Sequence, residues 1–146
     1  VAEITQLAHG AAMFIPKKVV DEIGLMAELY FLYYEEMDYC ERIKQAGYEI
    51  WYEPKSFILH KESMSVGKNS LLKTYYMSRN RWLYLRRNVD YPLFIFTAGY
   101  YLFIALPKNL LVHLFQGEMD HARKYFKGFI DGLFLKDIKE NPTLIN

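Results

Sequence analysis

The sequence predicts a mixed α/β fold over roughly the first 60 residues and an all-helical arrangement after them. Short apolar or alternating runs bounded by proline or glycine occur in the first part, as is typical of short strands. From about residue 69 onward, apolar residues favour three long helical stretches. With 146 residues, of which 52% are hydrophobic, the chain is large enough to bury a core and is not predicted to be disordered.

Each element follows from a local signal. The predicted strands are residues 10–16, 48–52 and 56–60. The predicted helices are residues 17–23, 35–46, 70–88 and 118–135, with glycine after the first two and a cap from Asn69 or Ser70 before the third. Strand edges near Met13 and Ile50 lack neighbours within the sequence, so we expect the purified chain to self-associate as a homo-oligomer.

Three carboxylates crowd the start of the helix predicted over residues 35–46. Glu35, Glu36 and Asp38 lie within four positions, and helix N-termini favour ionised carboxylates. An ionised carboxylate on a rigid element can take the proton of an attacking hydroxyl group, which an inverting sugar transfer requires. The alternative is structural, because acidic residues complement the helix dipole and Asp38 can pair with Arg42. The residues alone leave both interpretations open.

His60 is the candidate metal ligand. It ends a predicted strand, where a neutral imidazole could bind a divalent metal that holds a nucleotide diphosphate. The alternative is a structural hydrogen-bonding role, because no second ligand follows at a local spacing. His9, His113 and His121 lie in no ligand pattern. The single cysteine excludes an internal disulfide and a cysteine-based zinc site, which fits a reducing compartment.

Charge is distributed unevenly along the chain. Residues 1–66 hold 11 acidic and 6 basic side chains, whereas residues 67–116 hold 7 basic and 1 acidic. Segment 91–115 has Lys108 as its lone lysine or arginine and follows several arginines, so we expect a monotopic or re-entrant element on an anionic membrane surface. A helix packed on protein and a true membrane span are the alternatives. Nucleic-acid binding is not favoured, since the basic helix leads into an apolar stretch.

Six segments in order carry a resemblance to a known family. They are residues 10–16, 20–24, 30–42, 46–54, 60–65 and 75–80, with the sequences GAAMFIP, VDEIG, YFLYYEEMDYCER, AGYEIWYEP, HKESMS and YYMSRN. Together they resemble glycosyltransferase family 2, in particular its rhamnosyltransferase-like bacterial members. The resemblance implies an α/β fold, namely the C-terminal half of a GT-A (Rossmann-like) domain with short strands, followed by a helical, membrane-associating tail.

The resemblance also implies roles for individual residues. The expected site residues are Glu36, Glu35, Asp38, His60, Arg79 and Asn80. Glu36 matches the second position of the family's acidic pair, which carries the catalytic base, and Glu35 and Asp38 lie alongside. His60 matches a histidine expected near metal and diphosphate. Arg79 and Asn80 match a pair expected to bind the substrate diphosphate, although Arg79 could equally be structural or face a membrane.

An inverting glycosyltransferase is the implied function. It would move a sugar from a nucleotide sugar to a saccharide or lipid-linked acceptor in cell-surface polysaccharide synthesis, peripheral to the cytoplasmic face of the plasma membrane. Residues 1–66 would be the acceptor-side part of the catalytic domain and residues 67–146 a helical region. The family's nucleotide-binding half and its Asp-x-Asp motif do not occur in the sequence. The chain is therefore expected to be a truncated part of a longer enzyme.

Further expectations follow from that truncation. The longer enzyme is expected to use Mg²⁺ or Mn²⁺, whereas this chain alone is expected to bind no metal firmly and to be inactive. The alternative function, from another class, is a non-catalytic module for membrane contact and oligomerisation.

Overall fold

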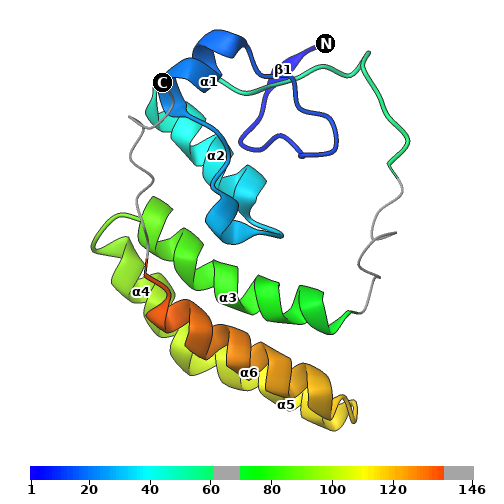
Figure 1. Cartoon of the computed structure of the whole chain (residues 1–146), viewed down its shortest axis with the longest axis vertical. Helices are drawn as coiled ribbons and strands as arrows, with labels where there is room; N and C mark the ends of the chain where they lie inside the picture. The colour runs from blue at the N-terminus through cyan, green and yellow to red at the C-terminus, as the bar shows by residue number, and fades with distance from the viewer. Residues whose placement is uncertain (61–69, 137–146) are drawn as a thin grey trace. The chain divides into compact units, whose positions relative to one another are not determined.

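The structure, a computed structural model, describes residues 1–60 and 70–136. Figure 1 traces the chain by colour, and the described residues fall into two compact units. The first unit contains residues 1–31 and 35–60, and the second contains residues 32–34 and 70–136. The predicted domain boundary at residue 66 and the polar loop after His60 lie outside the described residues.

The first unit is built from short helices and a minimal sheet (Figure 1). Its elements are β1 (Glu3–Ile4), α1 (Lys17–Ile23), the 3-10 turn η1 (Glu28–Tyr30), α2 (Glu35–Gln45) and β2 (Trp51–Tyr52). The two strands pair antiparallel, with Glu3 opposite Tyr52 and Ile4 opposite Trp51. A small apolar core of Val19, Tyr39, Cys40, Ile43 and Ile50 lies beneath the helices.

Helix α2 ends where its sequence predicts. Gly47 adopts φ 84°, a left-handed conformation that glycine accepts without strain. Its N–H bonds the Lys44 carbonyl and the Tyr48 N–H bonds the Ile43 carbonyl, which together close the helix. Within the helix Cys40 is buried, and burial raises the pKa of its thiol, so this side chain packs as a neutral group.

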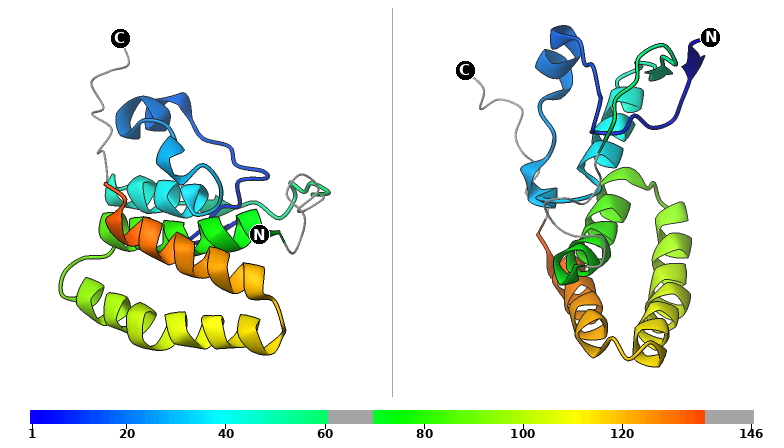
Figure 2. Two further views of the ribbon diagram at one scale, coloured as in Figure 1. Left: turned by 60° about the horizontal axis from the view of Figure 1, so that its bottom comes forward. Right: turned by 90° about the vertical axis from the view of Figure 1, so that its right-hand side faces the viewer.

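The second unit is helical. Its elements are α3 (Leu71–Asn88), α4 (Leu93–Tyr100), the π-helical turn η2 (Tyr101–Ala105), α5 (Leu106–Phe115) and α6 (Met119–Phe134). The Ser70 hydroxyl caps α3 by accepting the Lys73 N–H at 3.1 Å. Helices α4 and α5 are continuous through η2, and α6 turns back beside them, as the right-hand view of Figure 2 shows.

The π-helical turn in the apolar helix has a local cause. Pro107 lacks an N–H and its ring would collide with the carbonyl four residues earlier in a regular α-helix. The five-residue turn η2 directly precedes α5, which has this proline in its first turn. A π-turn adds one residue to the turn and relieves such a conflict without breaking the helix.

Helices α3 and α6 approach closely because two glycines face α3. A Cβ atom added at Gly128 would lie 2.3 Å from the Tyr75 carbonyl oxygen, and one at Gly132 would lie 2.4 Å from the Arg79 carbonyl oxygen. The buried Ser78 hydroxyl lies between the helices and donates to the Tyr125 carbonyl at 2.8 Å. Around this contact the core consists of Trp82, Leu85, Tyr101, Ala105, Leu106, Tyr125 and Phe129.

The prediction of an α/β fold, the C-terminal half of a GT-A (Rossmann-like) domain, is wrong. The described residues are mostly helical and contain one sheet of two two-residue strands. Segments 10–16 and 56–60 form no strand, and the strand predicted over 48–52 is reduced to Trp51–Tyr52. A strand requires a neighbour for its backbone groups, and the described part of the chain gives these segments none. The helices predicted over 17–23, 35–46, 70–88 and 118–135 are present within two residues.

Candidate functional site

Glu36 lies in the first turn of α2 and points to the loop that contains Gly10. Its Oε2 accepts the Gly10 backbone N–H at 2.5 Å, and the side chain is half-buried. A Cβ added at Gly10 would lie 2.6 Å from the same oxygen, so a side chain at this position would displace the end of the Glu36 side chain. The Glu36 carboxylate is therefore held in position by a backbone donor and stays partly accessible.

Asp38 has a different environment. It is fully buried, and its two oxygens accept the Tyr30 hydroxyl at 2.9 Å and the Arg42 Nε–H at 3.1 Å. Arg42 also donates to the carbonyls of Ile23 and Leu25. The pairing of Asp38 with Arg42 that the sequence offered as a structural alternative is thus present, and it ties α2 to the preceding loop.

The carboxylate of Glu35, the residue before Glu36, has one buried oxygen that is unsatisfied. This atom, Oε2, has no hydrogen-bond partner among the described residues. Leaving a polar atom buried without a partner costs roughly 1–3 kcal/mol, and in native structures such atoms are associated with strain, a catalytic role, or a bound water or ion. The carboxylates at 35, 36 and 38 therefore divide into an unsatisfied, a backbone-bound and an ion-paired group.

His60 lies beside a histidine that the sequence left unassigned. The rings of His9 and His60 are 5.6 Å apart between centroids and tilted by 58°. His9 also accepts the Ala11 N–H at its Nδ1, and it directly precedes Gly10. The loop around Gly10 thus contacts both Glu36 and His60. Gly10 begins the segment 10–16, which the sequence predicts to be a strand, so the contacts of this loop with Glu36 and His60 were not predicted.

Arg79 and Asn80 belong to the second unit. The buried Asn80 amide donates to the Leu32 carbonyl at 2.7 Å and the Tyr33 carbonyl at 2.9 Å, and accepts the Arg79 Nε–H at 2.8 Å. The Arg79 guanidinium lies over the Tyr76 ring, 4.5 Å from its centroid. Both amide hydrogens of Asn80 are therefore engaged, and a diphosphate contact by this pair stays a prediction.

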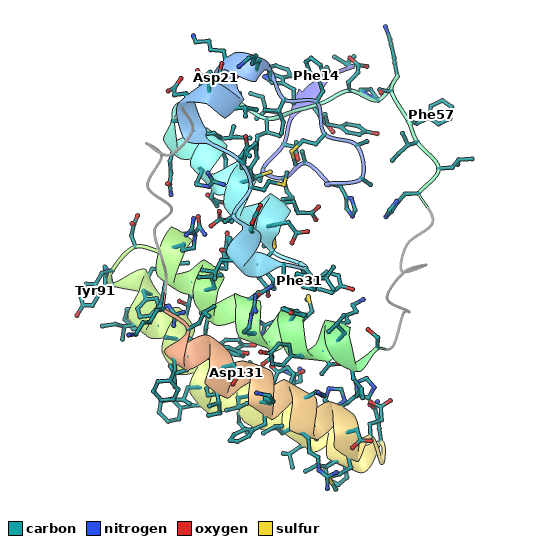
Figure 3. The ribbon with its side chains drawn as sticks, viewed as in Figure 1. Phe14, Asp21, Phe31, Phe57, Tyr91 and Asp131 are labelled. Carbon is teal, nitrogen blue, oxygen red and sulfur yellow. The ribbon has the colours of Figure 1, made fainter. Side chains whose placement is uncertain are left out.

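The backbone that Asn80 holds is strained. Phe31, Tyr33 and Tyr34 have φ of 61°, 66° and 74°, and Figure 3 labels the exposed Phe31 at the head of this run. Non-glycine residues in this region cost roughly 1–3 kcal/mol each and persist only where surrounding contacts hold them. Such strain often accompanies functional segments. Glu35 follows Tyr34 directly in the sequence.

Comparison with known proteins gives one informative similarity. The chain is 31% identical over 77 residues to a hexosyltransferase of low-salt glycan biosynthesis, Agl10, from Haloferax volcanii. The match covers 52% of this chain and a quarter of the length of that relative. No protein-family model matches the chain, and no solved structure matches it. The similarity supports a glycosyltransferase and no finer subtype.

Proposed function

We propose that this chain is part of a hexosyltransferase of glycan synthesis, in which Glu36 is the general base. The similarity to a glycan hexosyltransferase and the fixed, ion-pair-free position of Glu36 among the described residues support this proposal. The carboxylate takes the proton of the acceptor hydroxyl as that oxygen bonds to the anomeric carbon. The bond from that carbon to the diphosphate breaks at the same time, and the nucleoside diphosphate leaves. A saccharide or lipid-linked acceptor fits this chemistry.

A divalent metal would neutralise the leaving diphosphate in such an enzyme. Among the described residues His60 belongs to no group of three potential ligands, so it would need further ligands from the rest of the enzyme to hold the metal.

Replacing the base tests the proposal. Glu36→Gln in the natural-length protein should lower the transfer of labelled sugar from a nucleotide sugar to the acceptor by about 10²–10⁴-fold, the usual contribution of a general base. The matched control is Glu41→Gln on the same helix, which loses only a pairing with Lys44. Equal transfer by the wild type and Glu36→Gln would contradict the proposal and favour the non-catalytic module.

We further propose that the apolar helix lies on the cytoplasmic membrane surface. Residues 93–115 form a continuous helix of 23 residues, and an 18-residue stretch within it has a mean hydropathy of 1.4, so by length and composition the helix is able to cross a membrane. Only 17% of that 18-residue stretch is buried within the protein. Its exposed apolar side chains are Leu93, Ile95, Phe96, Leu102, Phe103, Ile104, Leu111, Val112, Leu114 and Phe115.

A pocket lined by two basic side chains favours a helix that lies on the membrane surface over one that spans the membrane. Lys108 and Arg81 line a pocket of about 340 Å³, and no carboxylate lines it. A lysine deep in the hydrocarbon costs roughly 2.5–3.5 kcal/mol, whereas at the surface two cations attract anionic headgroups. The helix would then bury its outer apolar face and keep Lys108 at headgroup level.

Vesicle flotation tests this surface. The wild-type chain should float with phosphatidylglycerol vesicles at low salt, and Phe103→Asp should weaken binding by roughly tenfold or more, since a buried phenylalanine contributes about 1.5–3 kcal/mol. The matched control is Phe57→Asp, because Phe57 is equally exposed but lies in the first unit (Figure 3). Equal flotation of both variants, or none by the wild type, would contradict the proposal.

A further inference from the structure

A cluster of three potential metal ligands lies at the turn between α5 and α6. His113, Glu118 and His121 each offer a ligand atom, and these atoms lie within 4.8 Å of one another. All three side chains are half-buried. The cluster belongs entirely to the second unit and uses none of the residues proposed for sugar transfer.

The backbone of the turn fixes two of the three residues. Gly117 adopts φ 74°, and its N–H bonds the Leu114 carbonyl at 3.1 Å. The Glu118 N–H bonds the His113 carbonyl at 2.8 Å. These two bonds form the Schellman arrangement that ends helices at a left-handed glycine. The separation of His113 from Glu118 is therefore set by the chain itself.

The third residue is oriented by α3. The Thr74 hydroxyl lies 2.8 Å from Nδ1 of His121 and 3.4 Å from the Ser70 carbonyl oxygen. In the tautomer of His121 that carries its proton on Nδ1, the Thr74 oxygen accepts that N–H and the ring lone pair lies on Nε2. Histidines that bind metals usually have their second nitrogen held in this way.

The spacing is close to that of a real site. Two ligands bound at about 2.0–2.1 Å in tetrahedral geometry are about 3.3 Å apart. His113 Nδ1 and Glu118 Oε2 are 2.9 Å apart, and the rings of His113 and His121 are stacked with centroids 5.5 Å apart and 21° between their planes. One ligand atom of each residue lies within 4.8 Å of the others, so side-chain rotation has to bring them closer by about 1.5 Å at most to surround a single ion.

The ligand types select the metal. Two imidazoles and one carboxylate suit Zn²⁺, Co²⁺, Ni²⁺ or Cu²⁺, whereas Mg²⁺ and Mn²⁺ prefer sites made of oxygen atoms. We propose that His113, Glu118 and His121 bind a divalent transition-metal ion of the zinc class, with the fourth position open to water. The ion joins the end of α5 to the start of α6.

Cobalt titration tests the site. The chain is treated with EDTA and titrated with Co²⁺, and its visible absorption should saturate at one ion per chain. His121→Ala should weaken binding by at least about 100-fold, and Thr74→Val by about tenfold through loss of orientation. His9→Ala, a histidine of the first unit, is the control and should bind as wild type does. The absence of saturable binding, or unchanged binding by His121→Ala, would overturn the inference.

A second measurement avoids variants that fail to fold. Ring-nitrogen chemical shifts of the wild type should move on addition of Zn²⁺ at His113 and His121 but not at His9. Shifts confined to other histidines would overturn the inference. Either outcome is distinguishable from failure of the proposed transfer, because that test reads sugar transfer at Glu36 in the first unit.

Discussion

The two units are stabilised by different means. In the first, a small core is supplemented by single long-range polar contacts, such as Tyr30 with Asp38 and Gly10 with Glu36. In the second, helix α6 contacts α3 through Gly128 and Gly132, so backbone meets backbone. The side-chain contacts of the first unit leave its carboxylates in three different environments, namely unsatisfied, backbone-bound and ion-paired. The close packing of α3 and α6 in the second unit leaves no room for an added Cβ atom. The stability of the first unit therefore depends on single side chains, and that of the second depends on a close backbone contact.

The largest expected effect comes from a substitution that pushes α3 and α6 apart, and it tests whether close helix packing stabilises the second unit. Gly132→Ala places a methyl group against the Arg79 carbonyl, and the overpacking should lower the free energy of unfolding by about 2–3 kcal/mol. Urea unfolding followed by circular dichroism measures the loss. Gly99→Ala is the matched control, because nothing lies within 4 Å of its Cβ and helix propensity favours alanine. Equal free energies of unfolding for Gly132→Ala and Gly99→Ala would show that the close packing of α3 against α6 does not stabilise the second unit.

A smaller effect is expected from the buried ion pair of the first unit. Asp38→Asn leaves Arg42 without its anionic partner and should lower the free energy of unfolding by about 2 kcal/mol. Glu36→Gln should leave the free energy of unfolding nearly unchanged while it lowers sugar transfer by about 10²–10⁴-fold. Denaturant titration of both variants separates the two roles. A stability loss from Glu36→Gln as large as that from Asp38→Asn would show that the carboxylates share one structural role.

The smallest effect concerns pH and the second unit. Hydrogen bonds from Lys127 and Tyr75 hold the pKa of Asp131 below its ordinary value (Figure 3 labels Asp131 on α6). A depressed pKa contributes stability above the ordinary value of about 3.9, and this contribution is lost as the pH falls through the lower, folded-state value. The stability difference between the wild type and Asp131→Asn should therefore shrink between pH 6 and pH 3. A stability difference that stays constant between pH 6 and pH 3 would contradict this prediction. Tyr75→Phe removes one of the hydrogen bonds to Asp131 and should make the dependence of stability on pH smaller.

The sequence was a good guide to helices and a poor one to strands. Helical spacing and glycine stops are local signals, and they located α2 and α6 within a residue or two. Strand formation depends on a partner that a local pattern does not reveal. The apolar run over residues 10–16 therefore looked like a strand, although in the structure it is a loop that presents Gly10 to Glu36.

The candidate site was predictable in part for the same reason. The carboxylates at 35, 36 and 38 were found because they are neighbours in sequence. Their separate environments depend on Gly10, Tyr30 and Arg42, of which only Arg42 is at a helical spacing. The histidine cluster was missed because His113 and His121 lie on different helices. The left-handed Gly117 between them was the signal available.

The π-turn at residues 101–105 gives the apolar helix one residue in reserve. The wider turn takes up an extra residue in roughly the rotation of an ordinary α-helical turn, so removing one residue from 101–105 would leave a regular helix with His113 still directed toward Glu118. In α5 no such reserve exists, because each α-helical residue advances the helix by about 100°. Removing one residue there would turn His113 away from Glu118. Single-residue deletions should therefore disturb this pairing far less within 101–105 than within α5.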